Sequence, residues 1–265
     1  MNWRRSILRI GLTLAFILLS AGCAAPKSLP SGPGAEWNLV VIGDSSMWEL
    51  GDAFARQIEK DKGVKVVLDD FTLPALRASS VREVLETGKS VNSRLEKLPD
   101  AIKGAEVVVM FVNPLGSIDP ARPLDFEGCF GSYQPNACEM ERFAKYTDDL
   151  QAIWAKVIEL RDGQPTILRA TDIYNPIVAD WIKNNAFDVC NECWGNMSAA
   201  ANQAADAYNV PFLSRYDAFN GATHSDDPNE KGYIDSDGEH PTQLAGEYTA
   251  GLLSKMGYEP VIPPE

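Results

Sequence analysis

The chain has 265 residues, of which 45% are hydrophobic, and a formal net charge of −13 at pH 7. That length is enough for one domain with a sizeable core. The acidic balance argues against nucleic acid as a partner and against electrostatic docking on anionic lipid.

Residues 1–22 have the pattern of an export signal. Three arginines precede an almost purely apolar run from Ile10 to Leu19. This run is too short to favour a membrane-spanning helix and is typical of a secretory signal peptide. Because the segment carries those three arginines and no acidic residue, its removal leaves 243 residues with a net charge of −16.

The end of this segment, Ser20-Ala21-Gly22-Cys23, resembles a bacterial lipobox, although an aliphatic residue usually stands where Ser20 does. In a lipobox the cysteine is lipidated and becomes the first mature residue; ordinary cleavage after Gly22 would instead leave Cys23 free. We expect lipidation, and hence a membrane-anchored lipoprotein at the cell surface or in the periplasm with no other membrane attachment. Residues 23–35 then form a flexible tether, and residues 36–265 form one domain.

From residue 36 onward, strand and helix patterns alternate. Short apolar runs predict strands at residues 39–42, 64–68, 106–112, 166–169 and 211–213. Apolar residues at helical spacing predict helices at residues 47–60, 80–98, 139–161, 197–208 and 242–256, with a short one near 177–182. The third strand is apolar without interruption, which indicates burial on both faces. We therefore predict an α/β fold: a three-layer α/β/α sandwich around a five-stranded parallel sheet.

Three long connections follow predicted strands. Residues 114–137 contain four prolines and three glycines with no clear period, and such a long loop is often functional. Residues 172–194 form a second insertion, and residues 215–239 form a polar loop. Ligands bind at the carboxyl ends of parallel strands, so these segments are expected on one rim of the sheet.

Four cysteines follow the signal segment: Cys129, Cys138, Cys190 and Cys193. An even number in an exported chain predicts two disulfides, for which three pairings are possible. The local pairing, Cys129 with Cys138 and Cys190 with Cys193, is favoured because both loops close at low entropic cost. A redox or metal role for the Cys-x-x-Cys pair is the alternative, and a structural role fits the surrounding pattern better.

A serine, a histidine and an aspartate stand where a hydrolytic triad would need them. Ser45 follows the first strand in Gly43-Asp44-Ser45, and Asp237 precedes His240 by three residues. An imidazole oriented by a carboxylate can remove the serine proton at neutral pH. The strand register favours Ser45 over Ser46 as the nucleophile. The only other histidine, His224, lies in the polar loop and is expected at the surface.

Together with Asn113 at the end of the third strand, these motifs resemble the blocks of the GDSL/SGNH hydrolase family of esterases and lipases. Gly43-Asp44-Ser45 matches the first block, Asn113 the asparagine block, and Asp237-x-x-His240-Pro241 the last block. The resemblance implies a flavodoxin-like fold, the nucleophile Ser45, the base His240 and the orienting carboxylate Asp237. It also implies that the Asn113 side chain and the Ser45 backbone N–H bind the oxyanion.

One family block departs from the pattern, because residues 70–80 contain no glycine where the family uses one for a third oxyanion donor. A backbone N–H near residues 76–78 is the expected substitute, and Ala78 is our candidate. We expect an exported serine esterase that forms an acyl-enzyme on small-molecule or glycan esters and needs no cofactor. The alternatives are a polysaccharide O-acetyl esterase and a non-catalytic glycan-binding lipoprotein.

A few other residues keep two interpretations each. Trp48 is either packing beside the site or a lip of it, and Trp181 and Trp194 either line an acyl or sugar site or pack against loops. Arg169 and Asp172 are either a salt bridge on the rim or substrate contacts. The acidic residues of the polar loop are spaced irregularly, so no metal site is expected.

Overall fold

A computed structural model describes residues 28–114, 129 and 138–261. Five parallel strands form one sheet in the order β2-β1-β3-β4-β5. The strands are β1 (Glu36–Gly43), β2 (Lys65–Thr72), β3 (Val107–Phe111), β4 (Ile167–Thr171) and β5 (Phe212–Leu213). This is the flavodoxin-like strand order, and it confirms the predicted five-stranded parallel sheet.

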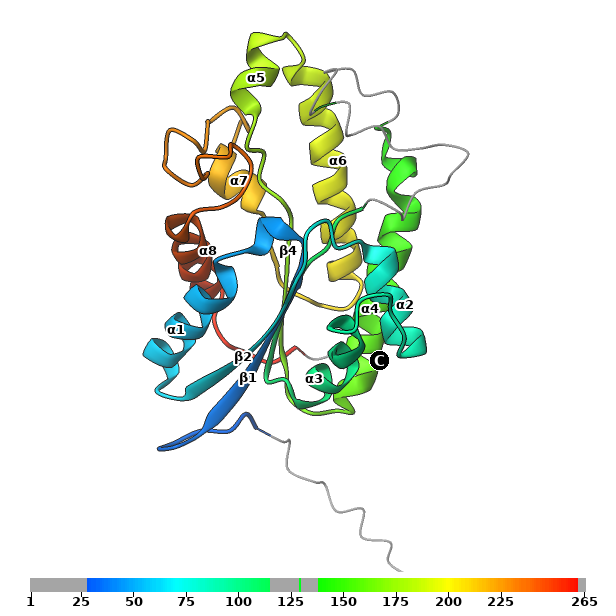
Figure 1. The fold of residues 1–265 in the computed structure, drawn as a ribbon, viewed down its shortest axis with the longest axis vertical. Helices are drawn as coiled ribbons and strands as arrows, with labels where there is room; N and C mark the ends of the chain where they lie inside the picture. The colour runs from blue at the N-terminus through cyan, green and yellow to red at the C-terminus, as the bar shows by residue number, and fades with distance from the viewer. Residues whose placement is uncertain (1–27, 115–128, 130–137, 262–265) are drawn as a thin grey trace, which may run out of the picture.

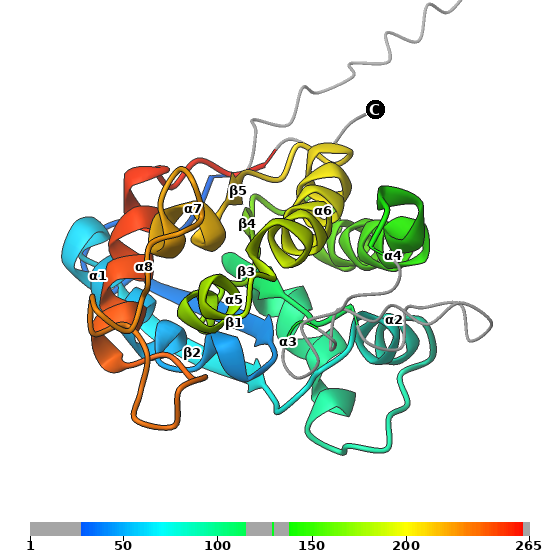
Figure 2. The same ribbon diagram turned by 90° about the horizontal axis from the view of Figure 1, so that it is seen from above.

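Helices cover both faces of the sheet (Figures 1 and 2). One face carries α1 (Leu50–Lys62) and α8 (Gln243–Lys255), and the other carries α2 (Ala78–Thr87), α3 (Leu98–Gly104), α4 (Ala144–Arg161) and α6 (Phe187–Asp206). Strand alternation explains the two cores: in β1, Leu39 and Val41 pack towards α1 and α8, whereas Val40 and Ile42 pack towards the other layer. The short helices α5 (Val178–Lys183) and α7 (Arg215–Asn220) lie at the upper end of Figure 1.

The predicted helix at residues 80–98 is interrupted: α2 fills its first half, and a short helical turn, Leu95–Lys97, leads into α3 at its end. The helix α2 ends at Gly88, which adopts a left-handed conformation (φ 70°) and whose N–H bonds to Val84 O. A glycine in this position is a common helix stop because it carries no Cβ that would oppose the left-handed backbone. Val91 is then fully exposed, and α3 starts only at Leu98. The apolar residues keep their helical spacing in the sequence beyond Gly88, although the helix itself stops there.

Two predicted loops contain helices. The helix α6 begins at Phe187, ten residues before the predicted start, so the Cys-x-x-Cys pair lies in its first turns. The polar loop starts with α7, whose first turn is capped by Ser214 Oγ accepting from Asp217 N at 3.0 Å. A serine followed three residues later by an acidic residue is a helix-start pattern.

The disulfides differ from the favoured local pairing. Cys129 is bonded to Cys190 and Cys138 to Cys193, so both bridges run between α6 and the segment before α4. Cys190 and Cys193 are both buried, and positions three apart lie on one face of a helix. The helix presents both sulfur atoms to the same neighbouring segment. This geometry decides the pairing, even though the local pairing would close shorter loops at a lower entropic cost.

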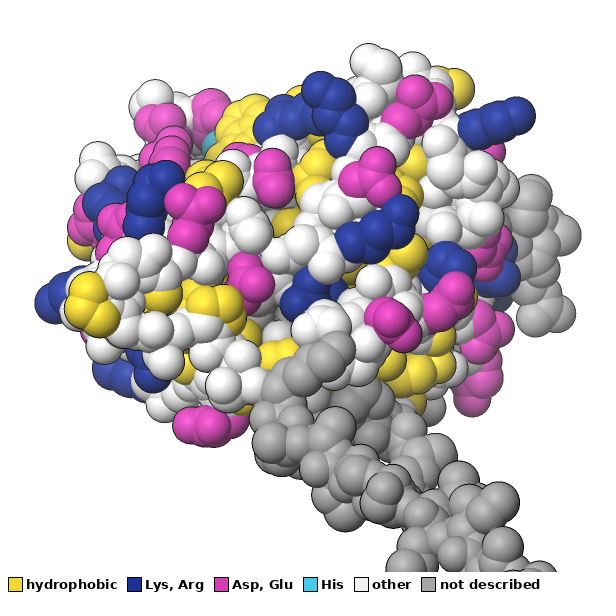
Figure 3. Space-filling model, turned by 90° about the horizontal axis from the view of Figure 1, so that it is seen from below, with side chains coloured by type: hydrophobic (Ala, Val, Ile, Leu, Met, Phe, Trp, Pro, Cys, Tyr) yellow, Lys and Arg dark blue, Asp and Glu magenta, His cyan; other side chains and the backbone are white. Residues whose placement is uncertain are grey.

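The expected signal segment, tether and lipidated Cys23 lie outside the described residues, as does most of the predicted loop at residues 114–137. No helix within the described ranges is long and apolar enough to cross a membrane. On the face seen from below, basic and acidic side chains are interspersed (Figure 3).

Candidate active site

The turn after β1 is tight and ordered by its own side chains. A short helical turn, Ser45–Met47, follows Gly43 and Asp44. A Cβ on Gly43 would come within 2.9 Å of the Phe111 carbonyl oxygen. Only a glycine at position 43 therefore allows β1 to lie this close to β3. Asp44 is buried and accepts hydrogen bonds from Ser46 N (2.9 Å) and Ser46 Oγ (2.7 Å).

The two adjacent serines have different environments. Ser46 is buried, and its hydroxyl donates to Asp44 and accepts from Arg215 Nη2 at 3.2 Å. Ser45 is partly exposed, and within the described chain its hydroxyl forms no hydrogen bond. Ser45 is therefore the serine whose oxygen is accessible to a substrate, in agreement with the strand register.

The predicted histidine–aspartate pair is formed. His240 Nδ1 lies 2.7 Å from Asp237 Oδ2, and Asp237 Oδ1 accepts from the backbone N–H groups of His240 (3.0 Å) and Glu239 (2.9 Å). These hydrogen bonds from His240 N, Glu239 N and the imidazole lower the pKa of Asp237 to about 2. With an ionised carboxylate at Nδ1, the imidazole carries its proton there and leaves Nε2 as the basic nitrogen.

Trp48 joins the two ends of the chain. Its ring stacks on the His240 ring, with centroids 4.6 Å apart and planes 20° from parallel. Trp48 is three residues after Ser45, so the stack brings His240 beside the Ser45 turn, although Ser45 and His240 are not directly hydrogen-bonded in the described structure. The Trp48 ring packs on His240 and is still 37% exposed, which fits both packing beside the site and a lip of it.

Asn113 reaches the same place from the end of β3. Its Nδ2 donates to Asp44 Oδ2 at 3.2 Å, so the asparagine and nucleophile turns share one buried carboxylate. Burial raises the pKa of Asp44, while the hydrogen bonds from Ser46 and then Asn113 oppose that rise.

Ala78 is wrong as an oxyanion donor. Its N–H donates to the Asn113 carbonyl oxygen at 2.9 Å, and Leu76 N likewise donates to Leu73 O at 3.1 Å. Arg77 and Asn113 form an isolated parallel β-bridge just beyond β3. The Ala78 N–H is one of the donors of that bridge and is therefore occupied. Arg77 N–H is the amide of this stretch that bonds to nothing in the described ranges, and it replaces Ala78 as the candidate.

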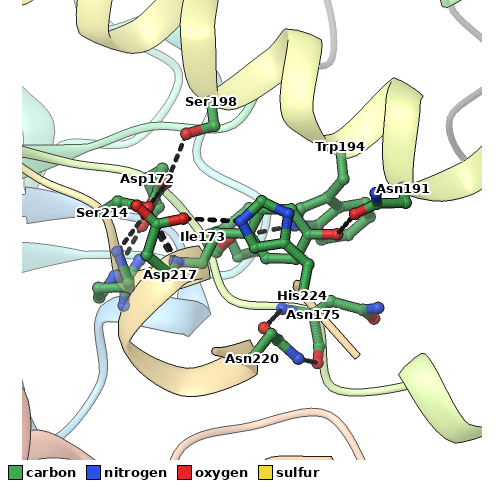
Figure 4. Close-up of polar contacts among 12 residues, drawn as sticks. Asp172, Ile173, Asn175, Asn191, Trp194, Ser198, Ser214, Asp217, Asn220 and His224 are labelled. Carbon is green, nitrogen blue, oxygen red and sulfur yellow. Dashed lines mark hydrogen bonds and ion pairs between the residues drawn. The ribbon is translucent and has the colours of Figure 1, made fainter. Parts of the chain in front are cut away.

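Arg215 is a buried part of the site that sequence reasoning placed in a polar loop. Its Nη1 donates to Ser46 O at 2.7 Å, and its Nε donates to Asp172 O at 2.6 Å. The Asp172 carboxylate in turn accepts from Ser198 Oγ, Ser214 Oγ and two backbone N–H groups (Figure 4). The capping pattern that starts at Ser214 was the available signal that this segment is ordered.

His224 belongs to a different cluster. Its Nε2 lies 2.7 Å from Asp217 Oδ1, and its ring stacks on Tyr216 at 3.9 Å (Figure 4). Both serines drawn beside this pair, Ser198 and Ser214, donate to Asp172 instead. The second histidine is partly exposed and has no serine hydroxyl as a partner among the described residues.

The remaining candidates are structural. Trp181 and Trp194 are fully buried and pack edge to face, with centroids 5.5 Å apart. Arg169 and Asp172 are both buried and form no salt bridge with each other; Arg169 donates instead to the carbonyl oxygens of Leu168 and Gly257. In the described part of the chain, no cluster of three His, Cys, Asp or Glu side chains could hold a metal ion.

No protein-family model matches the sequence, and the comparison with curated proteins found no match. Solved structures with a similar fold include a lipase from a goat rumen metagenome, 18% identical, with a TM-score of 0.58 over 84% of this chain and 98% of that one. A putative SGNH hydrolase from Slackia heliotrinireducens is 15% identical, with a TM-score of 0.51 over 84% and 100%. A variant of Axe2, an acetyl xylan esterase from Geobacillus stearothermophilus, is 15% identical, with a TM-score of 0.51 over 88% and 99%. The chain therefore has the α/β fold of SGNH hydrolases.

Proposed function

We propose that this protein is a serine ester hydrolase that uses Ser45, His240 and Asp237. The observation that carries the proposal is the 2.7 Å contact of His240 Nδ1 with Asp237, combined with the stacking of His240 on Trp48 beside the Ser45 turn. The hydrolases and esterases that share the fold support the same reaction class, although a fold alone does not decide a function.

The proposed reaction has two steps. Ser45 Oγ attacks the ester carbonyl carbon while His240 Nε2 takes the hydroxyl proton, and that proton then passes to the departing alcohol oxygen. The acyl-enzyme is next attacked by water that His240 deprotonates, which releases the carboxylic acid and restores Ser45. The oxyanion would accept hydrogen bonds from the Ser45 and Arg77 backbone N–H groups and from Asn113, each worth about 100- to 1,000-fold in rate.

The proposed substrates are small-molecule or glycan esters, met by an exported lipoprotein at the cell surface or in the periplasm. One structural neighbour is a lipase and another is an acetyl xylan esterase. The polysaccharide O-acetyl esterase is therefore retained as the second candidate within the same chemistry. A hydrolysis screen over p-nitrophenyl esters of increasing acyl length and over acetylated glycans separates the two.

The test is labelling by a fluorophosphonate probe together with hydrolysis of p-nitrophenyl acetate. We expect the purified protein to be labelled at Ser45, and the Ser45→Ala variant to lose both labelling and hydrolysis. Ser93→Ala, at an exposed serine far along the chain, is the matched control and should react like the wild type. Folded wild-type protein that takes no label would favour the non-catalytic glycan-binding alternative.

The two histidines provide a second matched pair. We expect His240→Ala to abolish labelling, because it removes the base, and His224→Ala to leave it intact, because His224 pairs with Asp217 outside the site. Equal losses in both variants would contradict the assignment of His240.

A further inference from the structure

Arg215 is the first residue of α7, and only 2% of its surface is exposed. Its guanidinium uses all three nitrogens: Nε donates to Asp172 O, Nη1 to Ser46 O and Nη2 to Ser46 Oγ. The planar fork of an arginine is suited to such a set of fixed acceptors. One side chain therefore connects Asp172, at the end of β4, to Ser46, the residue beside the nucleophile, which lies 169 positions before Arg215 in the sequence.

The same guanidinium also contacts aromatic residues that lead to the loop of His240. It lies 5.6 Å from the ring centroids of both Phe111 and Tyr174. The Tyr174 hydroxyl donates to Glu239 O at 3.0 Å, and Glu239 immediately precedes His240. Arg215 thus supports the tyrosine that holds the histidine loop, while it bonds directly to the serine turn.

Electrostatics agree with a fixed position for this group. Arg215 is a buried cation near two buried carboxylates, Asp44 and Asp172, and its charge opposes the rise in pKa that burial causes in both. If the guanidinium moved away, the buried carboxylates would be left without a counter-charge, which is costly. Its position is therefore held by these charges. Asp44 in turn binds Asn113, which extends the connection to a proposed oxyanion donor.

We propose that Arg215 is a positioning residue, which holds the Ser45–Ser46 turn and the His240 loop in mutual register through Ser46 and Tyr174. This inference rests on the proposed function for its kinetic effect. It also predicts that Arg215 restrains the turn, and the hydrogen exchange of the turn measures this without any assay of activity. A displacement of about 1 Å at a reacting group can lower the rate by about 100-fold, so small shifts are detectable.

The experiment compares Arg215→Lys with Arg169→Lys. Arg169 is the matched control, because it is also a buried arginine but lies in β4 and donates only to the Leu168 and Gly257 carbonyl oxygens. We expect Arg215→Lys to lower kcat for p-nitrophenyl acetate by about 10- to 100-fold with little change in KM, since the single ammonium nitrogen of a lysine cannot reach all three acceptors placed around the planar guanidinium. Hydrogen exchange of the amides at residues 44–49 should become faster, and fluorophosphonate labelling slower.

Ser46→Ala is the second variant, in case Arg215→Lys does not fold. It removes the hydroxyl that accepts from Nη2 and donates to Asp44, but it keeps the buried cation and its bonds to Ser46 O and Asp172 O, so a smaller loss of kcat at unchanged KM is expected. Wild-type kcat and exchange in folded Arg215→Lys, or equal kinetic losses in Arg215→Lys and Arg169→Lys, would overturn the inference. If the wild type takes no label, the proposed function fails, and the exchange rates at residues 44–49 still decide whether Arg215 holds the turn.

Discussion

At the scale of single residues, Asp237 and Glu239 are two acids of one loop that differ in their contact with His240. Only the Asp237 carboxylate bonds to the imidazole, while Glu239 is exposed and contributes its backbone. Because its hydrogen bonds lower the pKa of Asp237 to about 2, this carboxylate becomes protonated only as the pH falls towards that value. Protonation of Asp237 therefore cannot cause a loss of activity above about pH 4.

We predict that Asp237→Asn lowers kcat by up to about 10,000-fold, because the imidazole loses the acceptor that selects its tautomer. Steady-state kinetics with p-nitrophenyl acetate measures the loss. Glu239→Gln removes one charge at nearly the same place and should keep wild-type activity; a similar loss there would contradict the specific role of Asp237.

The residues of the proposed triad could be named from the sequence because each stands in a short motif at the end of a predicted element. Ser45 follows a strand, and Asp237 and His240 precede a helix. The role of Arg215 and the engagement of the Ala78 amide could not be predicted in this way. The first depends on a side chain that crosses the core to Ser46, and the second on a backbone bridge that consumes the Ala78 amide.

At the scale of elements, α8 contacts the segment between the Ser45–Met47 turn and α1 through a glycine. A Cβ on Gly246 would lie 2.6 Å from the Glu49 carbonyl oxygen and 2.9 Å from the Glu49 Cβ. Glu49 itself has a left-handed backbone (φ 65°) and immediately precedes α1. The close approach of α8 to Glu49 keeps the helix that follows His240 against the segment that follows Ser45.

We predict that Gly246→Ala destabilises the fold by about 1 to 3 kcal/mol, because a backbone oxygen cannot move aside as a flexible side chain would. Gly251 is the matched control on the same helix, since a Cβ there meets nothing within 4 Å. Gly251→Ala should instead stabilise the fold by up to about 1 kcal/mol through helix propensity. Urea unfolding of both variants is the measurement, and equal effects would contradict the packing argument.

Element boundaries were less predictable than the elements themselves. All five strands were expected, because each contains a short apolar run, and in the fully buried strand β3 that run is continuous. The helix α6 was placed ten residues too late, because its first turns carry the polar and cysteine residues of Phe187–Gly195. Those positions bury their apolar side towards the segment that contains Cys129 and Cys138, a partner that helical periodicity alone does not reveal.

At the scale of the whole molecule, two disulfides join α6 to the segment before α4 across sequence separations of 61 and 55 residues. Cross-links over loops of this size stabilise a fold by about 4 kcal/mol each in the chain-entropy estimate. The crossed and the local pairing predict opposite outcomes for two double variants. Cys129→Ser with Cys190→Ser removes one bridge if the pairing is crossed and both bridges if it is local.

We predict that this first double variant loses about 4 kcal/mol, and that Cys129→Ser with Cys138→Ser loses about twice as much, because it breaks both crossed bridges. Urea unfolding without reductant gives the comparison. Chymotrypsin and a glutamate-specific protease, applied after alkylation of free thiols, separate Cys129 from Cys138 and Cys190 from Cys193. Unreduced peptides that link Cys129 to Cys190 and Cys138 to Cys193 are expected. A Cys190–Cys193 peptide, or the reverse order of the two stability losses, would show that α6 does not hold the segment before α4.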